Sequence, residues 1–303
     1  MKVVVAGGTG FIGGALVGAL ADAGHRVVVF TRRRVADAPS IPEFRQWDAN
    51  TFGPWGAELN GADAVLNLAG ESLGGRRWSR TQKHRIVTSR IRATKALVDA
   101  IRQAKRRPSV LVNISTVGYY GSVAEGEVDE QHPPGNDFLA ALCRQWETEA
   151  LAAESLGTRV VLPRVGLVLG KGGALQRLAL PFKFFLGGTI GSGRQWVSWV
   201  HRDDLVSALM FLLDRREISG AVNLVAPESA RMEQLCSSLG DVLRRPSWLR
   251  VPDPVLRIAL GEMAGMLITG QRVIPARLVE SGYQFIFPTL RHALHDCLKP
   301  VRS

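Results

Sequence analysis

Cysteine is scarce in this 303-residue chain, which contains only Cys143, Cys236 and Cys297. No two of them form a CxxC pair, and the sequence contains no metal-binding motif such as HExxH. This pattern argues against a disulfide framework and against a zinc site. It is typical of a protein in a reduced compartment, so we expect a cytoplasmic protein without a bound metal.

Long apolar runs are also missing. The best candidate, residues 255–269, is interrupted by Arg257 and Glu262, whereas a membrane-spanning helix needs about 20 apolar residues. The N-terminus enters an apolar strand and then glycines, without the charged and apolar regions of a signal peptide. We therefore expect neither secretion nor a membrane partner.

Acidic residues are in the minority, and the formal net charge is +11. A basic surface concentrates anions around itself, so nucleic acid has to be considered as a partner. The cations, however, form short scattered clusters without interleaved aromatic residues, which is typical of solvated surface arginines. Nucleic-acid binding is therefore disfavoured. These clusters are 32–34, 76–77, 105–107, 215–216 and 244–245.

Hydrophobic periodicity supplies the fold class. Short β-branched runs alternate with amphipathic segments, beginning with a strand, a helix and a strand within the first 30 residues. The pattern predicts strands at 3–6, 27–30, 64–67, 110–115 and 159–163, and helices at 11–23, 81–105, 137–156, 203–213 and 232–243. We expect an α/β protein with a doubly wound parallel Rossmann-type sheet in residues 1–165. A smaller α+β region on the substrate side is expected in residues 166–303.

The strongest chemical signal is the glycine-rich segment 7–13, which follows a predicted strand and opens a predicted helix. In a dinucleotide-binding turn, the first glycine allows a tight bend, the second lets the backbone approach pyrophosphate, and the third permits close helix packing. The free N–H groups of the helix N-terminus attract phosphate. An ordinary strand-to-helix turn is the alternative. The predicted cofactor contacts are Gly7, Thr9, Gly10, Phe11, Ile12 and Gly13.

The end of the second predicted strand bears on which dinucleotide binds. An NAD-selective protein usually places an acid there for the ribose 2′-hydroxyl, but this chain has Thr31 followed by three arginines. A guanidinium can grip a 2′-phosphate with paired charge-assisted bonds. We therefore predict NADP(H) in preference to NAD(H), held by Thr31 and Arg32. Arg33 and Arg34 stay open as alternatives, and so does a merely solvated strand end.

At this point several segments together resemble a known group. They are 67–71, 89–91, 117–121, 163–170 and 191–196. This combination is similar to the extended and atypical short-chain dehydrogenases, which are NAD(P)-dependent and epimerase/dehydratase-like, and in particular to a subfamily of unassigned substrate. The stretch from Pro246 to Phe285 resembles that subfamily's small C-terminal domain of unknown function, which we place at 246–297.

The resemblance implies roles for further residues. Leu68, Ala69 and Gly70 would line the cofactor at the end of a strand. Arg90 would bond cofactor or substrate oxygens from the next helix, although a surface cation is an equal alternative. Thr116 matches the position of the family's catalytic Ser or Thr, whose hydroxyl polarises a carbonyl.

One departure from the family weakens the expectation of catalysis. Members usually carry YxxxK on the following helix, with tyrosine as the proton donor. Here Leu139 and Cys143 stand where that tyrosine and lysine belong. Tyr120 is the alternative acid. In the competing interpretation, Tyr119 and Tyr120 belong to the aromatic wall of the pocket. We assign no chemistry to the segment 201–204, where Asp203 suits a helix cap.

Two classes of function follow. The first is an NADP-dependent oxidoreductase or epimerase-like enzyme acting on an unidentified carbonyl or alcohol, with Thr116 and either Tyr120 or a water supplying the chemistry. The second is a non-catalytic NADP(H)-binding regulatory or interaction protein. The sequence identifies neither the substrate nor the oligomeric state.

Overall fold

A parallel β-sheet forms the centre of the computed structural model, which describes residues 1–33 and 42–298. Its strands run in the order β13-β8-β5-β4-β1-β2-β3, and β6 pairs with the end of β8. The strands are β1 Lys2–Ala6, β2 Arg26–Thr31, β3 Glu43–Gln46, β4 Ala64–Asn67, β5 Val110–Asn113, β6 Ser115–Thr116, β8 Arg159–Val165 and β13 Gly220–Leu224.

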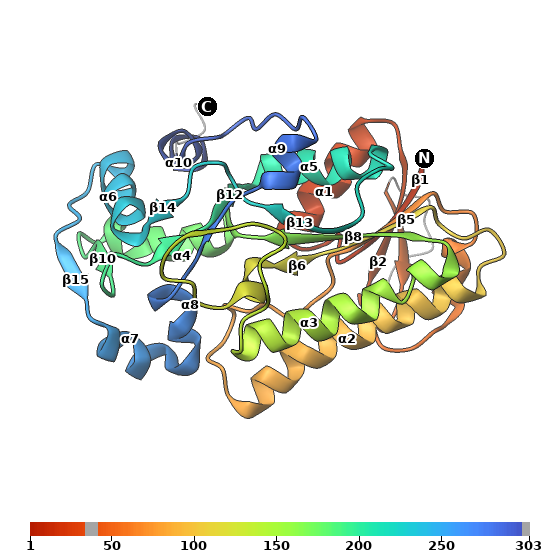
Figure 1. Ribbon diagram of the computed structural model, residues 1–303, viewed down its shortest axis with the longest axis horizontal. Helices are drawn as coiled ribbons and strands as arrows, with labels where there is room; N and C mark the ends of the chain where they lie inside the picture. Colours follow the sequence, from red (N-terminus) through yellow and green to blue (C-terminus); the bar gives the residue numbers. More distant parts are fainter. Residues whose placement is uncertain (34–41, 299–303) are drawn as a thin grey trace.

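Helices cover both faces of this sheet (Figure 1). The helices α1 (Phe11–Asp22) and α5 (Arg202–Asp214) lie on one face, and α2 (Arg80–Gln103) and α3 (Phe138–Leu151) lie on the other. Strand β1 shows why: Val3 and Val5 pack toward α1 and α5, whereas Val4 and Ala6 pack toward α2. Because both faces are buried, the central strands read as continuous apolar runs. The predicted doubly wound α/β fold is confirmed.

The second part of the chain forms a third hydrophobic core beside the sheet. Figure 1 shows it at the end of the molecule opposite β1 and β2. The core takes residues from β9 Leu167–Leu169, α4 Gly173–Lys183, β10 Gly188–Ile190, β11 Trp196–Val197, β12 Trp199–His201, β14 Ala230–Arg231, α6 Met232–Leu243 and α10 Leu290–Leu298. The other elements of the second part are β15 Leu249–Val251, α7 Asp253–Leu260, α8 Gly265–Ile268 and α9 Ala276–Glu280, of which α9 packs on the central sheet. The short strands β7 Glu127–Val128 and β16 Arg272–Val273 pair with each other. The 3₁₀ turns are η1 Pro54–Leu59, η2 Val117–Tyr120, η3 Glu154–Leu156 and η4 Gly261–Ala264.

The two parts are joined more closely than a boundary at residue 165 suggests. Strand β13 comes from the second part but pairs in parallel with β8, with Gly220 opposite Val161 and Leu224 opposite Val165. Helix α5, also from the second part, packs on the same face of the sheet as α1. The Rossmann sheet is therefore not confined to residues 1–165.

Candidate functional site

The glycine-rich turn lies between β1 and α1, at the carboxyl end of the sheet. Gly7 has φ +81°, and a β-carbon on it would lie 2.7 Å from the carbonyl carbon of Leu68. A β-carbon on Gly13 would lie 2.2 Å from the Gly7 oxygen, so α1 packs directly on the turn. Gly10, the N-cap residue of α1, has no side chain to cap the helix and, like Thr9, is exposed. The backbone N–H groups of the first helical turn are thus open to an anionic ligand.

Phe11 links this turn to the second part of the chain. Its ring lies where β-carbons on Gly170, Gly172 and Gly173 would fall, at 2.9 to 3.3 Å. The Arg202 guanidinium carbon lies 5.7 Å from the ring centroid. Phe11 therefore serves as a packing contact between the two parts as well as the first residue of α1, while Ile12 is half-buried behind it.

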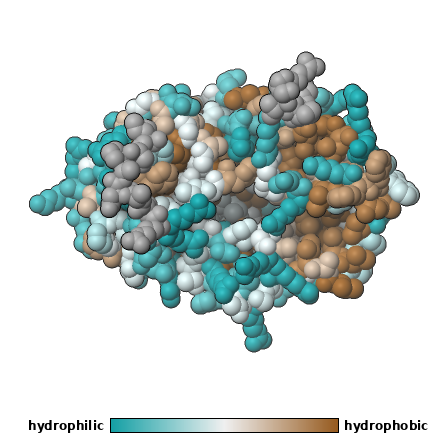
Figure 2. Space-filling view, turned by 180° about the vertical axis from the view of Figure 1, so that it is seen from behind, coloured by the Kyte–Doolittle hydropathy of each residue, from teal (hydrophilic) through white to brown (hydrophobic). Residues whose placement is uncertain are grey.

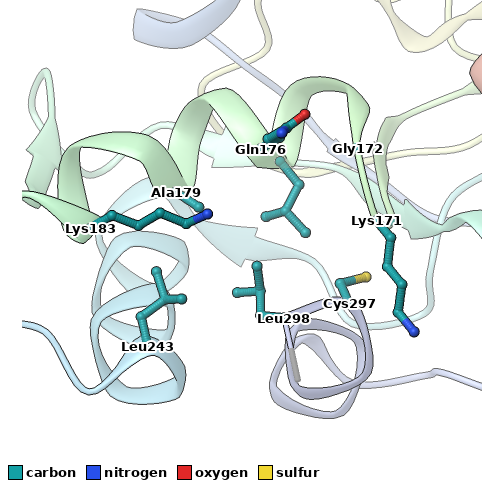
Figure 3. A pocket seen from close by; sticks show the side chains of 10 residues that line it. Lys171, Gly172, Gln176, Ala179, Lys183, Leu243, Cys297 and Leu298 are labelled. Carbon is teal, nitrogen blue, oxygen red and sulfur yellow. The ribbon is translucent and has the colours of Figure 1, made fainter. Parts of the chain in front are cut away.

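Figure 3 shows a separate cavity of about 240 Å³ on the second part. Side chains from three helices surround it, with Lys183 from α4, Leu243 from α6 and Leu298 from α10. Gly172 lines this cavity and also adjoins Phe11, so a single loop separates the cavity from the glycine turn. None of the predicted site residues lines it.

At the end of β2, Thr31 is buried and Arg32 and Arg33 are exposed. The Thr31 Oγ1 accepts a hydrogen bond from the Arg33 backbone N–H at 3.2 Å, which leaves its own proton free to donate. Both guanidinium groups lie at the surface beside the carboxyl end of the sheet, while Arg34 lies outside the described residues. The assignment of the 2′-phosphate to Arg32 stays a prediction.

The turn after β4 is fixed by a buried polar cluster. The Asn67 Oδ1 accepts from the Ala69 backbone N–H at 3.1 Å, and its Nδ2 donates to Thr94 and Asn113 at 2.9 and 2.7 Å. The Trp146 indole also donates to Thr94. Leu68 and Ala69 are half-buried beside the glycine turn, and Gly70 is exposed. These three residues therefore lie at the same edge as Gly7 and Gly10, as the resemblance implies.

Arg90 is buried on α2, directly behind this turn. Its guanidinium carbon would lie 2.9 Å from a β-carbon on Gly70 and lies 5.1 Å from the Trp146 ring centroid. Its Nη1 donates to the carbonyls of Glu71 and Ile86, at 2.9 and 3.2 Å.

No carboxylate among the described residues forms an ion pair with this guanidinium, and its buried Nε has no partner there. Burial lowers the pKa of Arg90 to about 10. A buried cation without an anion is costly, so this location is suited to receive one. Arg90 is consequently not the exposed surface cation that sequence analysis left open.

Thr116 lies at the end of β6, where its Oγ1 accepts from the Gly118 backbone N–H at 3.1 Å. The Cys143 Sγ lies 3.5 Å from the same oxygen, and Leu139 packs over Gly118. The two residues that stand where tyrosine and lysine are expected are thus beside Thr116. Burial raises the pKa of the Cys143 thiol, so it is neutral and cannot replace a lysine cation.

Tyr120 is only 1% exposed and belongs to a buried network. Its hydroxyl donates to Asn223 Oδ1 at 2.6 Å and accepts from Arg164 at 3.0 Å. Arg164 forms a two-bond ion pair with Glu147, which also accepts from the Ser115 hydroxyl at 2.6 Å. Burial raises the pKa of Tyr120 to about 12. This arrangement argues against Tyr120 as the proton donor, because its proton is already engaged and its hydroxyl faces protein.

This network was not predicted from the sequence, although Glu147 lies in the predicted helix 137–156 and Arg164 in the segment 163–170. Tyr119 lies beside it, with the Arg164 guanidinium carbon 3.4 Å from its ring centroid. A place for Tyr119 in the aromatic wall of the pocket stays a prediction. A buried ion pair between a helix and a following strand leaves no periodic signal in the sequence.

His201, Asp296 and Cys297 bring ligand-type atoms within 4.8 Å of one another. The His201 Nδ1, however, accepts from the Asp203 backbone N–H at 3.2 Å and thereby caps α5. In neutral histidine the other nitrogen, Nε2, must then carry the proton, so it cannot bind a metal. It lies 3.4 Å from Asp296 Oδ2. The sequence had suggested Asp203 as the cap of α5. The structure shows that His201 supplies it instead.

The parallel sheet, the glycine turn and the uncapped helix define a dinucleotide-binding protein of the Rossmann type. Residues 3–224 match the NAD dependent epimerase/dehydratase family, and the chain belongs to that family. Residues 251–297 match a domain of unknown function, DUF1731. The resemblance seen in the sequence is confirmed, including its C-terminal domain.

Similar proteins span nearly the whole chain. The epimerase family protein SDR39U1 homolog, chloroplastic, of Arabidopsis thaliana is 43% identical over 99% of this chain and 87% of its own length. The epimerase family protein YfhF of Bacillus subtilis is 38% identical over 98% of both. The crystal structure of human epimerase family protein SDR39U1 with NADPH is similar at a TM-score of 0.88 and 36% identity, covering 98% of this chain and 99% of that one.

None of the helices in the described residues is long and apolar enough to cross a membrane. The three cysteines are free and buried. Location in the cytoplasm stays a prediction.

Proposed function

We propose that this chain is an NADPH-dependent oxidoreductase or epimerase-like enzyme that acts on a carbonyl or alcohol. The observation that carries the proposal is the placement of Thr116 at the same sheet edge as the open turn 7–13 and the unpaired Arg90. Rossmann sheets bind their ligands outside the carboxyl ends of the strands, which is where these groups lie.

The residues present fit a dinucleotide. The glycine turn leaves no side chain between the backbone and a pyrophosphate, and the buried Nε of Arg90 has no partner in the described protein. The N-terminal turn of α1 would hold the pyrophosphate, Thr31 and Arg32 the 2′-phosphate, and residues 68–70 the ribose beside Arg90. When bound, nicotinamide supplies or accepts a hydride.

The protein's own contribution to the reaction comes from Thr116. Its Oγ1 accepts the Gly118 N–H and has only the weakly bonding Cys143 Sγ as a further partner, so its hydroxyl proton can turn to a substrate carbonyl oxygen. That hydrogen bond stabilises the negative charge that develops on the oxygen. With Tyr120 engaged elsewhere, we assign the proton transfer to a water molecule that Thr116 orients.

A second candidate function is an NADP(H)-binding protein without turnover. It is favoured by Leu139 and Cys143, which place an apolar side chain and a neutral thiol beside Thr116 instead of an acid and a cation. In that case cofactor occupancy would control the binding of a partner rather than a reaction.

Calorimetric titration with NADPH and NADH, followed by absorbance measurements with a panel of carbonyl compounds, separates the two. NADPH binding with consumption of its reduced nicotinamide supports the enzyme. Binding without consumption by any carbonyl in the panel supports the second candidate. Absence of binding to either nucleotide overturns both.

A further inference from the structure

One end of the molecule carries an unusual concentration of exposed apolar side chains. Ile258, Trp248 and Phe184 are 76, 70 and 67% exposed, so they project from the surface and do not line a groove. Figure 2 shows the corresponding hydrophobic area at the end formed by the second part of the chain. We name it the α4–α7 surface; its apolar members are Leu180, Phe184, Phe185, Leu186, Trp248, Val255 and Ile258.

Backbone pairing brings these segments together. Strands β10 and β15 run side by side with Gly188 opposite Leu249, which places the turn after α4 next to the segment before β15. The Trp248 indole donates to the Phe185 carbonyl at 3.1 Å. Helix α7 then begins at Asp253, directly after β15, and only Leu256 of this helix is buried. Residues 184–186 and Trp248 are therefore neighbours, and α7 continues from the strand that follows Trp248, so we treat the three stretches as one surface.

The apolar turn has a defined conformation. Phe185 has φ +60°, which is rare for a bulky residue and is retained only where the surroundings enforce it. Its backbone N–H and that of Leu186 donate to the carbonyls of Phe182 and Pro181. The Arg245 guanidinium carbon lies 4.4 Å from its ring centroid. The fold thus holds three consecutive apolar side chains in solvent at the expense of backbone strain.

The segments that carry these apolar side chains are rich in cations, although α6 beside them carries the exposed acids Glu233 and Asp241. The stretches 171–186 and 244–260 contain seven basic residues and one acid, Asp253. The basic residues are Lys171, Arg177, Lys183, Arg244, Arg245, Arg250 and Arg257, all exposed. A projecting apolar centre with a basic margin is complementary to an anionic surface that also accepts apolar side chains.

We propose that the α4–α7 surface docks on the face of an anionic lipid bilayer. Tryptophan and phenylalanine favour the interfacial region of a membrane, and arginine and lysine pair with lipid phosphates. A second copy of the chain would bring two basic margins together, which is unfavourable. Single-stranded nucleic acid needs aromatic stacking, but four of the seven apolar side chains are aliphatic.

This proposal revises the expectation of no membrane partner, which rested on the length of apolar runs. The length of an apolar run indicates whether a helix can span the bilayer. It does not reveal a surface assembled from separate stretches of the chain, here residues 180–186, 248 and 255–258. The inference does not depend on the proposed enzymatic function.

The test is co-sedimentation of the full chain with vesicles of phosphatidylcholine alone or mixed with phosphatidylglycerol. We expect at least about tenfold stronger partitioning to the mixed vesicles, weakened by added salt. Equal partitioning to both, or partitioning to neither, overturns the proposal. Retention on single-stranded DNA with no vesicle binding overturns it in favour of nucleic acid.

Matched variants separate the two components of the surface. Phe184→Gln combined with Ile258→Gln is expected to abolish vesicle binding. Val279→Gln combined with Ile286→Gln, which alters apolar residues that are 53 and 55% exposed outside this surface, is expected to leave it unchanged. Equal losses in the two double variants overturn the proposal. Urea denaturation of each variant verifies that it is folded.

The same logic applies to charge. Lys183→Glu with Arg257→Glu is expected to weaken binding to the mixed vesicles about tenfold or more. The control pair, Arg92→Glu with Lys95→Glu on the exposed face of α2, changes the net charge by the same amount and should weaken binding less. If both pairs weaken binding equally, net charge and not this surface is responsible, and the proposal fails.

Trp248 provides an internal probe. Of the seven tryptophans, Trp196 is half-buried and five others are buried, so Trp248 is the one that vesicles can reach. We expect a blue shift of fluorescence with mixed vesicles that Trp248→Phe removes. A shift that persists in this variant overturns the assignment. Light scattering provides a second check: a stable dimer that the double variant Phe184→Gln, Ile258→Gln dissociates would also overturn it.

Discussion

Glu147 and Arg164 form an ion pair inside the protein, with Oε1–Nε and Oε2–Nη2 distances of 3.0 and 2.8 Å. Glu147→Gln keeps the volume but leaves a buried guanidinium without its counter-charge. We expect the free energy of unfolding in urea to fall by about 3 kcal/mol. Glu149→Gln, on the same helix but only half-buried, should change it by less than about 0.5 kcal/mol. Similar effects in both variants would contradict a special contribution from the pair.

Arg90 should affect stability and ligand binding in opposite directions. Arg90→Met removes an unpaired buried cation, so the free energy of unfolding without ligand should stay constant or rise by about 1 kcal/mol. The affinities for NADPH and NADH should both fall by about tenfold, because Arg90 is assigned to a part of the cofactor that both nucleotides have in common. Urea denaturation and calorimetry measure the two effects. Arg92→Met, which alters an exposed arginine of α2, is the control, and unchanged affinity in Arg90→Met would remove Arg90 from the site.

Cofactor selectivity is assigned to a different arginine. Arg32→Ala should weaken NADPH binding by about tenfold or more and leave NADH binding unchanged, because only NADPH carries the 2′-phosphate. Titration of Arg33→Ala in parallel tests the neighbouring exposed guanidinium. A selective loss in Arg33→Ala alone would move the assignment to that residue, and equal losses for both nucleotides would remove it from either.

Thr116 should matter for turnover and not for cofactor affinity. Thr116→Val preserves the shape of the side chain but deletes the hydroxyl, and we expect kcat with a reactive carbonyl to fall about 100-fold. Thr116→Ser should retain most of the activity. The Kd for NADPH, measured by calorimetry, should be unchanged in both variants. A Thr116→Val protein with normal kcat would exclude the hydroxyl from the reaction.

The cap of α5 should make stability depend on pH. Burial lowers the pKa of His201 below its ordinary value of 6.5, so the unfolded chain binds a proton more readily than the folded one. The contribution of neutral His201 to the free energy of unfolding is complete above about pH 6.5 and is lost as the pH falls below that value. His201→Asn retains an acceptor for the Asp203 N–H but does not titrate there. Unfolding free energies between pH 5 and 7.5 should therefore fall less steeply in this variant than in the parent chain.

Most of the sheet and its helices could be predicted because both faces of the sheet are buried. Strands β4 and β5 are buried throughout and apolar up to a final asparagine, and the helices carry an apolar stripe. Strand β3 was missed because its sequence, EFRQ, is polar and lies at the edge of the sheet. Strand β13 was missed because five residues with a glycine and an asparagine resemble a loop.

The candidate site was predictable where backbone geometry demands particular residues. Gly7 and Gly13 cannot carry a side chain without a collision, and Thr116 follows a strand. Arg90 was left undecided, although it lies four residues after Ile86 and seven before Leu97, within the buried stripe of α2. That spacing indicates burial. The engagement of Tyr120 with Asn223, by contrast, depends on a contact across 103 residues that no local pattern reveals.

The return of β13 to the central sheet has a consequence for how substrates are admitted. The chain leaves the sheet at β8 and comes back beside it, so the second part is anchored by two crossings and not by one flexible tether. A swinging motion of the second part would have to bend the segments on both sides of β13 together, while the β8–β13 ladder stays intact. We therefore expect a smaller relative motion of the two parts around a ligand than a single linker would allow.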